Sequence, residues 1–179
     1  MRLGHTLMAL TAGALAACST PPPRAPATVA AQVDLKRFMG DWYVIANIPT
    51  FLEKGAHNAV ESYRLDTDGS IATTFTFNDG ASDGPRKTYT PRGFVLDSTN
   101  ARWGMRFVWP IKADYRISYL ASDYSLTVIG REARDYVWIM ARTPTIAEAE
   151  YQRMVEFVTR EGYDVSKLQR VPQQPRAAR

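Results

Sequence analysis

Short runs of strand-forming residues follow one another through most of this chain, and no helical pattern interrupts them. Turn signals such as Asp66–Gly69 and Asn78–Gly80 separate the runs at intervals of roughly 8 to 15 residues. Parallel strands need long crossover connections, so this spacing predicts antiparallel neighbours. The predicted strands are residues 42–48, 59–65, 71–77, 87–89, 93–96, 102–109, 115–120, 126–130 and 136–142. A series of this length folds either as two stacked sheets or as a closed barrel.

One segment after these runs has helical periodicity. Between Ile146 and Glu161, apolar residues recur at helical spacing. Thr145 is the predicted N-cap, with Glu148 completing a capping box, and Gly162 is the predicted stop. The polar face carries charges of both signs, which is unlike the Lys-rich face of a membrane-surface helix. We therefore expect this helix to pack its apolar stripe against the outside of the sheet.

The N-terminus has the pattern of a secretory signal. A basic residue, Arg2, precedes a short apolar segment and a small-residue ending before Cys18. The apolar segment is too short to span a bilayer, which needs about 20 residues. The sequence from Leu15 to Cys18 resembles the bacterial lipobox, which implies cleavage before Cys18 and acylation of its sulfur and amine. The alternative is an ordinary secretory signal with an incidental cysteine.

The predicted organisation has four parts. Residues 1–17 are a lipoprotein signal peptide, and residues 18–33 are a lipidated cysteine followed by a Pro/Ala-rich tether. Residues 34–171 form one domain, and residues 172–179 are a disordered tail. A Pro-rich tether of this length reaches about 45 Å. Cys18 is the only cysteine of the chain, so the mature domain is stabilised by packing and not by a disulfide.

Three short motifs occur in order along the predicted strands. They are Gly40, Trp42 and Tyr43 at the first strand, Asp123 and Tyr124 in a turn before the seventh barrel strand, and Arg142 after the last strand. With these motifs the chain resembles the lipocalin family, and the bacterial outer-membrane lipocalins in particular, from Leu35 to about Val171. Ser122 departs from the Thr that the second motif often has. The resemblance implies an all-β fold, an eight-stranded antiparallel up-and-down barrel with a C-terminal α-helix packed outside.

The first and last motifs have a physical reason to meet. The first and last strands of a closed barrel are adjacent, so Trp42 and Arg142 are expected at the same end although a hundred residues separate them. An indole fills the narrow end of a barrel, and a guanidinium on its face gains about 0.5–2 kcal/mol of cation–π energy. We expect these residues to close the barrel and not to catalyse.

The alternation of side chains along each strand predicts an apolar interior. Glu61 is the exception: it either faces inward, where it would meet an amine-bearing headgroup, or faces outward with Val60 and Ser62 inward. The alternative to a ligand cavity is that the same side chains fill the barrel as core. The predicted cavity residues are Glu61, Tyr63, Phe75, Trp103, Met105, Phe107, Tyr115, Ile117, Tyr119, Trp138 and Met140.

The sequence favours a binding protein over an enzyme. The mature chain has one histidine, His57, and no nucleophile or phosphate-binding motif, so we expect no catalytic residues, no metal and no cofactor. Scattered basic residues with a net charge of +4 do not indicate nucleic acid. The resemblance implies a fatty acid or lysophospholipid as ligand, held for envelope storage, transport or repair. It also implies an outer-membrane protein anchored through Cys18 on the periplasmic face. A structural lipoprotein with a filled barrel, a lipocalin-like enzyme and a homodimer stay open.

Overall fold

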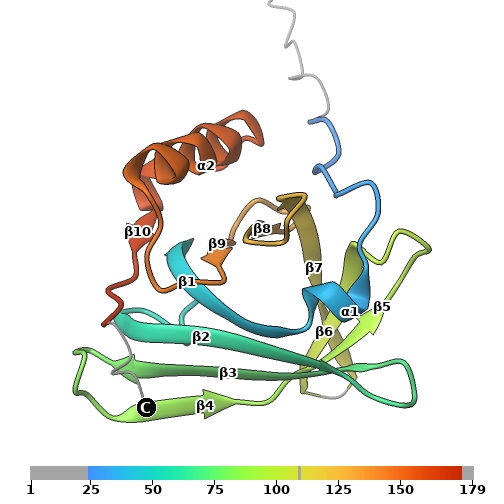
Figure 1. Cartoon of the computed structure of the whole chain (residues 1–179), viewed down its shortest axis with the longest axis horizontal. Helices are drawn as coiled ribbons and strands as arrows, with labels where there is room; N and C mark the ends of the chain where they lie inside the picture. The colour runs from blue at the N-terminus through green and yellow to red at the C-terminus, as the bar shows by residue number, and fades with distance from the viewer. Residues whose placement is uncertain (1–23, 109, 175–179) are drawn as a thin grey trace, which may run out of the picture.

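A computed structural model describes residues 24–108 and 110–174 of the chain. The predicted signal peptide, Cys18, Trp109 and residues 175–179 lie outside the described residues. The strands are β1 Gly40–Ile48, β2 Ala56–Leu65, β3 Ile71–Asp79, β4 Arg86–Tyr89, β5 Arg92–Val95, β6 Arg102–Val108, β7 Ile111–Leu120, β8 Leu126–Gly130, β9 Val137–Ala141 and β10 Gln169–Arg170. The α-helices are α1 Leu35–Phe38 and α2 Glu148–Arg160, and a short 3-10 helix spans Val165–Lys167 (Figure 1).

The strands form one closed antiparallel barrel. Each strand from β1 to β9 pairs with its neighbours, and β1 pairs with β9 to close the circle. β4 and β5 both pair with β3 and are separated by Thr90 and Pro91, so together they make one wall position and the barrel has eight. Proline has no backbone N–H to donate, which explains the break. The predicted eight-stranded barrel is therefore confirmed.

Two hydrophobic clusters lie on the two sides of the barrel wall. One fills the interior and includes Trp42, Trp103 and Ile117. The other lies outside, where the apolar side of α2 contacts the outer faces of β1, β8 and β9 through residues such as Met154 and Val158. Figure 1 shows α2 packed beside β1 and β9. The predicted external position of the helix is confirmed.

The start of α2 differs from the prediction. The helix begins at Glu148 with Ala147 as N-cap and no side-chain cap, so the predicted capping box at Thr145 is wrong. The Glu148 carboxylate instead accepts hydrogen bonds from Gln152 and from Arg170 in β10, and is therefore turned away from the start of the helix. Gly162 ends the helix as predicted, with a φ of +85° that favours glycine.

The predicted tether is wrong for its described part. Residues 24–33, here called the N-terminal strap, lie along the barrel: the N–H of Ala30 donates to Ile117 O at 2.8 Å and that of Val33 to Thr99 O at 2.8 Å. Val33 is fully buried. The strap has no strand or helix pattern, but its small side chains allow its backbone to approach the neighbouring chain and bond to it.

The predicted disordered tail is also wrong for residues 172–174. β1 and β2 pair only in the halves that lie nearest the closed end of the barrel, where Gly40–Tyr43 pair with Val60–Tyr63. Beyond this point the two strands diverge. The side-chain amide of Gln173 lies in the gap and donates to Val44 O at 2.9 Å and Ala59 O at 3.0 Å. The C-terminal segment thus satisfies carbonyl groups that the diverging strands leave unpaired.

One end of the barrel is closed by the predicted contact between the first and last motifs. The guanidinium carbon of Arg142 lies 3.8 Å from the centre of the buried Trp42 ring. Arg142 also donates to the backbone oxygens of Asp41, Arg37, Phe38 and Met39. Gly40 has a φ of +93°, and a β-carbon there would lie 3.4 Å from Arg142 Nη1. The guanidinium therefore holds α1 across the closed end.

The remaining motif residues contact the same end or the outer surface. The Tyr124 hydroxyl accepts a hydrogen bond from the N–H of Asp34, and Arg37 lies 4.0 Å above its ring. Asp123 accepts from the backbone and hydroxyl of Ser125, which shapes the turn before β8. Tyr43 packs on the outer cluster. Asp123 and Tyr124 thus fix the turn that faces α1.

We predict that Trp42→Ala lowers the free energy of unfolding by about 3–5 kcal/mol, because it removes the largest side chain of the plug and the surface on which Arg142 lies. Urea unfolding followed by circular dichroism measures the change. The control is Phe51→Ala, an aromatic truncation at an exposed position, which should change stability by about 0.5 kcal/mol or less. Equal losses in the two variants would contradict the assigned role of Trp42.

Candidate ligand-binding site

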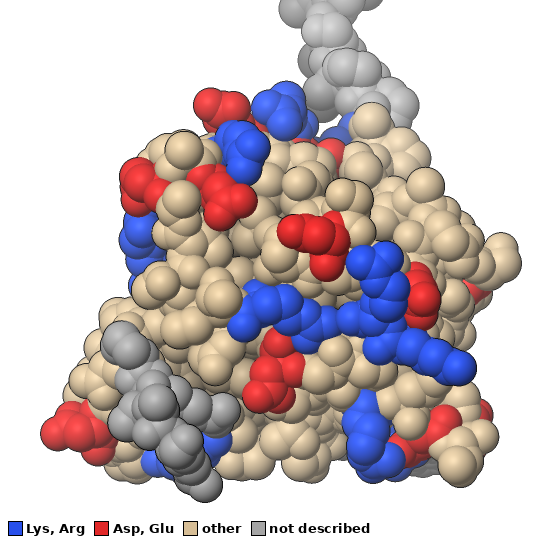
Figure 2. Space-filling view, viewed as in Figure 1, with Lys and Arg blue, Asp and Glu red and all other residues tan. Residues whose placement is uncertain are grey.

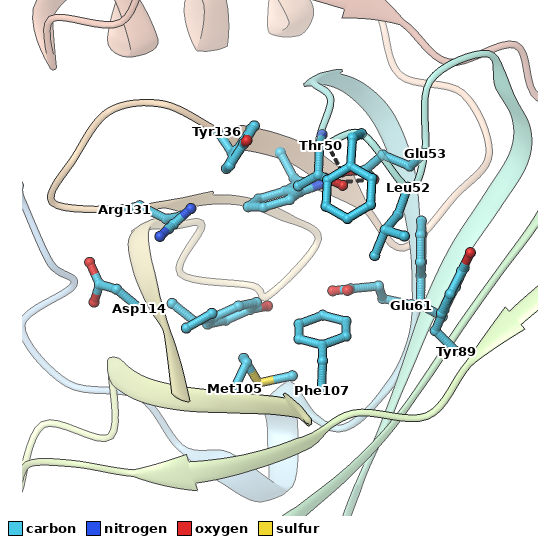
Figure 3. Close-up of a pocket in the computed structure, with 15 residues that line it drawn as sticks. Thr50, Leu52, Glu53, Glu61, Tyr89, Met105, Phe107, Asp114, Arg131 and Tyr136 are labelled. Carbon is cyan, nitrogen blue, oxygen red and sulfur yellow. Dashed lines mark hydrogen bonds between the residues drawn. The ribbon is translucent and has the colours of Figure 1, made fainter. Parts of the chain in front are cut away.

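A cavity of about 160 Å³ opens at the end of the barrel opposite α1 (Figure 3). Its walls come from β2, β3, β4, β6, β7 and β9, and its mouth is bordered by the β1–β2 and β8–β9 loops. The lining is predominantly apolar. The lining residues are Thr50, Phe51, Leu52, Glu53, Glu61, Phe75, Tyr89, Met105, Phe107, Ala113, Asp114, Tyr115, Arg131, Tyr136 and Trp138.

Apart from Tyr119, the predicted cavity residues lie at two levels of the barrel interior, either in the cavity wall or in the packed core below it. Six of them line the cavity, namely Glu61, Phe75, Met105, Phe107, Tyr115 and Trp138. Four others, Tyr63, Trp103, Ile117 and Met140, lie in the interior core and do not line it. The cause is Phe38 of α1, whose ring lies 5.5 Å from that of Trp103 and 5.6 Å from that of Tyr63. Phe38 was not among the predicted interior residues, and its ring places the floor of the cavity higher than predicted.

The prediction for Tyr119 is wrong, because its ring lies outside the barrel. The register between β7 and β8 shifts between Ile117 and Tyr119, which marks a β-bulge. A bulge adds one residue to one strand and reverses which side chains face inward. Tyr119 consequently packs on α2, with its ring 5.6 Å from that of Phe157.

Glu61 faces inward, which decides the alternative that the sequence left open. Its carboxyl group contacts the Tyr63 hydroxyl, and the Tyr63 and Tyr115 hydroxyl oxygens are 2.5 Å apart. Burial raises the pKa of Glu61 to about 8, and the nearby Glu53 carboxyl adds to this shift. Glu61 is therefore protonated at neutral pH and forms a polar, uncharged patch in an otherwise apolar wall.

Glu53 is a second acid of the site, is buried, and was not among the predicted cavity residues. It accepts hydrogen bonds from the indole N–H of Trp138 at 3.0 Å and from the backbone N–H of Thr50 at 2.9 Å. Burial raises the pKa of Glu53, and these hydrogen bonds oppose the shift. The carboxyl group holds the β1–β2 loop to β9, so Phe51 and Leu52 project at the mouth. Nothing in the sequence around Glu53 indicates that it holds this loop in place.

The mouth has one cation among the described lining residues. Arg131 bonds to Asp135 at 2.9 Å and lies 5.3 Å from the Tyr136 ring centre. Asp114 is paired with Arg116. The described part of the chain contains no group of three His, Cys, Asp or Glu residues arranged to hold a metal ion. In residues 24–108 and 110–174, no helix has the length and hydropathy needed to cross a bilayer.

The closed barrel with an apolar cavity at one end defines a β-barrel protein built to enclose a lipophilic ligand. A family model for the lipocalin-like domain matches residues 33–173, and the chain belongs to the lipocalin family. The chain is 34% identical over 169 residues to the outer membrane lipoprotein Blc of Citrobacter freundii, covering 94% of this chain and 96% of that protein. It is 35% identical over 172 residues to the protein of the same name from Escherichia coli strain K12, with the same coverage.

More distant relatives share the fold. Temperature-induced lipocalin-1 of Arabidopsis thaliana is 33% identical over 151 residues, which cover 79% of this chain and 80% of that protein. Among solved structures, the cockroach allergen Per a 4 superposes with a TM-score of 0.63 at 18% identity, covering 84% of this chain and 95% of that chain. Insecticyanin from the tobacco hornworm Manduca sexta has a TM-score of 0.63 at 16% identity, covering 85% and 87%. These two structures support the barrel fold alone.

We predict that the stability of the protein falls between pH 4.5 and about pH 8 because of Glu61. The folded state keeps the proton that the unfolded chain releases near pH 4.5, so the stabilisation is complete below that pH and is lost as the pH rises through about 8. Urea unfolding at pH 5 and pH 9 measures the difference for the native chain and for Glu61→Gln. The variant, which is always neutral at this position, should show a smaller loss. An unchanged loss would contradict the burial of an ionisable group here.

Proposed function

We propose that this protein binds one fatty acid or lysophospholipid, with the acyl chain in the cavity and the polar headgroup at the mouth. Burial of the chain supplies the affinity: each enclosed CH₂ contributes about 0.8 kcal/mol, so ten give about 8 kcal/mol before the costs of ordering. The protein holds such lipids for storage, transport or repair of the cell envelope.

The observation that carries this proposal is the apolar cavity with a single open end. Its volume of about 160 Å³ lies below the roughly 300–1,000 Å³ of sites for bulky ligands. A single alkyl chain is the slim ligand that suits this space, and a lipid with two chains exceeds it. At the mouth, Arg131 is the cation that an anionic headgroup would meet.

The proposed location is the periplasmic face of the outer membrane. The relatives from Citrobacter freundii and Escherichia coli are named outer membrane lipoproteins and align over 94% of this chain. In this chain the lipobox-like sequence ends at Cys18, and acylation of that residue would anchor the protein, since two acyl chains already suffice for stable anchoring. The residue after it, Ser19, is what lipoproteins sorted to the outer membrane show. A homodimer is compatible with this arrangement.

Two other functions make different predictions. A structural envelope lipoprotein would have a barrel that accepts no ligand, and a lipocalin-like enzyme would turn over an ester. The described lining residues include no histidine, serine or cysteine, so they contain no Ser–His or Cys–His pair, which favours binding over catalysis.

We predict that lysophospholipid and a long-chain fatty acid each change the tryptophan fluorescence of the chain from Ser19 onward, saturating at one ligand per protein. Trp138 lines the cavity and supplies the signal. No response from the folded protein would favour the structural alternative, and release of free fatty acid would favour the enzyme.

We further predict that Ala113→Leu weakens this binding at least about tenfold, because the added atoms occupy the cavity that the chain would fill. The matched control is Ala149→Leu on the exposed side of α2, which adds the same atoms away from the cavity. Equal affinities in the two variants would contradict the assigned site.

A further inference from the structure

The N-terminal strap runs from the closed end of the barrel to its mouth. Val33 bonds to Thr99 in the β5–β6 turn at the closed end, and Ala30 bonds to Ile117 in β7. The N–H of Ala27 then points to the Glu132 carboxylate in the β8–β9 loop, which borders the mouth. In Figure 1 the strap is the dark-blue segment that leads into α1. The chain therefore leaves the barrel beside the cavity opening.

This end of the strap is firmly held. Arg134, whose side chain is almost fully buried, donates to Ala25 O at 2.8 Å and to Glu161 O at 3.1 Å. The Thr28 hydroxyl donates to the Glu161 carboxylate, and Arg24 donates to Gly162 O at 2.6 Å. These bonds connect the strap to the β8–β9 loop and to the end of α2. The exit point is thus part of the folded barrel and not of a free linker.

Exposed apolar side chains gather at the same end. Among the described residues, five large hydrophobic side chains are exposed, and four of them lie at the mouth end, in the β1–β2 loop and beside the β6–β7 turn: Phe51 at 78%, Leu52 at 37%, Phe107 at 52% and Ile111 at 71%. They are here called the apolar rim, and Figure 3 shows Leu52 and Phe107 at the cavity. The fifth, Leu96 at 53%, lies at the closed end. Figure 2 shows Lys and Arg side chains on the face that carries α1.

We propose that the mouth of the barrel faces the bilayer and that the apolar rim docks on the lipid surface. The inference rests on the proposed acylation of Cys18. Six Cα–Cα steps separate Cys18 from Arg24, at most about 22 Å of extended chain. A ten-residue strand such as β2 measures about 33 Å, and at a barrel tilt of roughly 35–45° it spans roughly 23–27 Å along the barrel axis. An anchor at Cys18 therefore keeps the mouth end closer to the membrane than the closed end.

In this orientation the apolar rim and the acylated Cys18 together hold the mouth of the barrel against the bilayer. Exposed apolar patches mark surfaces that contact lipid or protein, and here the patch lies at the opening of an apolar cavity, on the β1–β2 loop and beside the β6–β7 turn. A lipid could then pass between the bilayer and the cavity without its chain crossing water. The packed strap, in place of a 45 Å flexible tether, is what restricts the barrel to this orientation.

The test uses the full acylated protein in phospholipid vesicles with a polarity-sensitive dye at one of two matched positions. Ile111→Cys places the dye on the rim, and Leu96→Cys places it on another exposed aliphatic position, at the closed end. Acylated Cys18 does not react, so each chain carries one dye. With spin-labelled lipids in the vesicles, we expect loss of fluorescence at position 111 and none at position 96.

The other outcomes either overturn the proposed docking or show that the proposed acylation of Cys18 has failed. Loss at position 96 alone, or at neither position in the anchored protein, overturns the docking. A second dye per chain in the mass spectrum shows that Cys18 is free, which is a failure of the proposed anchor. In that case the same labels in a Cys18→Ser background test the rim alone: quenching only at position 111 supports it, and none overturns it.

A second variant tests the consequence for lipid transfer. Ile111→Ser should slow transfer of a lysophospholipid from vesicles to the protein several-fold and leave its affinity in solution unchanged, because Ile111 does not line the cavity. The matched Leu96→Ser variant should leave both unchanged. Equal transfer rates for the two variants would overturn the assigned role of the rim.

Discussion

The contact of Arg142 with Trp42 is the constraint on which the rest of the barrel depends. It joins the last strand to the first and, through four backbone carbonyls, holds α1 across the opening. A barrel needs its two edge strands to meet in one register, and an indole under a guanidinium favours one arrangement over its alternatives. Because this end is sealed in this way, the cavity that the described residues line opens at the other end.

The two ends of the barrel therefore have different chemistry. The closed end is packed with aromatic rings around Phe38, whereas the open end has a cavity lined in part by two acids and has exposed apolar side chains. Glu61 and Glu53 are accommodated by different means, the first by keeping its proton and the second by hydrogen bonds from Trp138 and Thr50. The polar groups thus shape the cavity without placing an unpaired charge in it.

Several site residues were predictable because the period of a β-strand is simple. Where a strand is regular, alternation places its side chains correctly, as it does for Phe75 in β3. The prediction failed for Tyr119, where a bulge shifts the period, and for the floor of the cavity, where Phe38 enters from a four-residue helix. The composition of the N-terminal strap predicted a tether, and this prediction was wrong for residues 24–33. The burial of Val33 depends on a neighbouring surface that no local pattern reveals.

The sequence by itself determined the strand order, the antiparallel connections, the external helix and the three motifs that identify the family. These follow from local rules: turn residues, side-chain periodicity and the adjacency of the first and last strands in a barrel. Only the tertiary structure decided that Glu61 faces inward, how deep the cavity is and where the strap ends. Each of these depends on contacts between segments distant in the chain, and such contacts are settled by packing and not by the residues next to them in sequence.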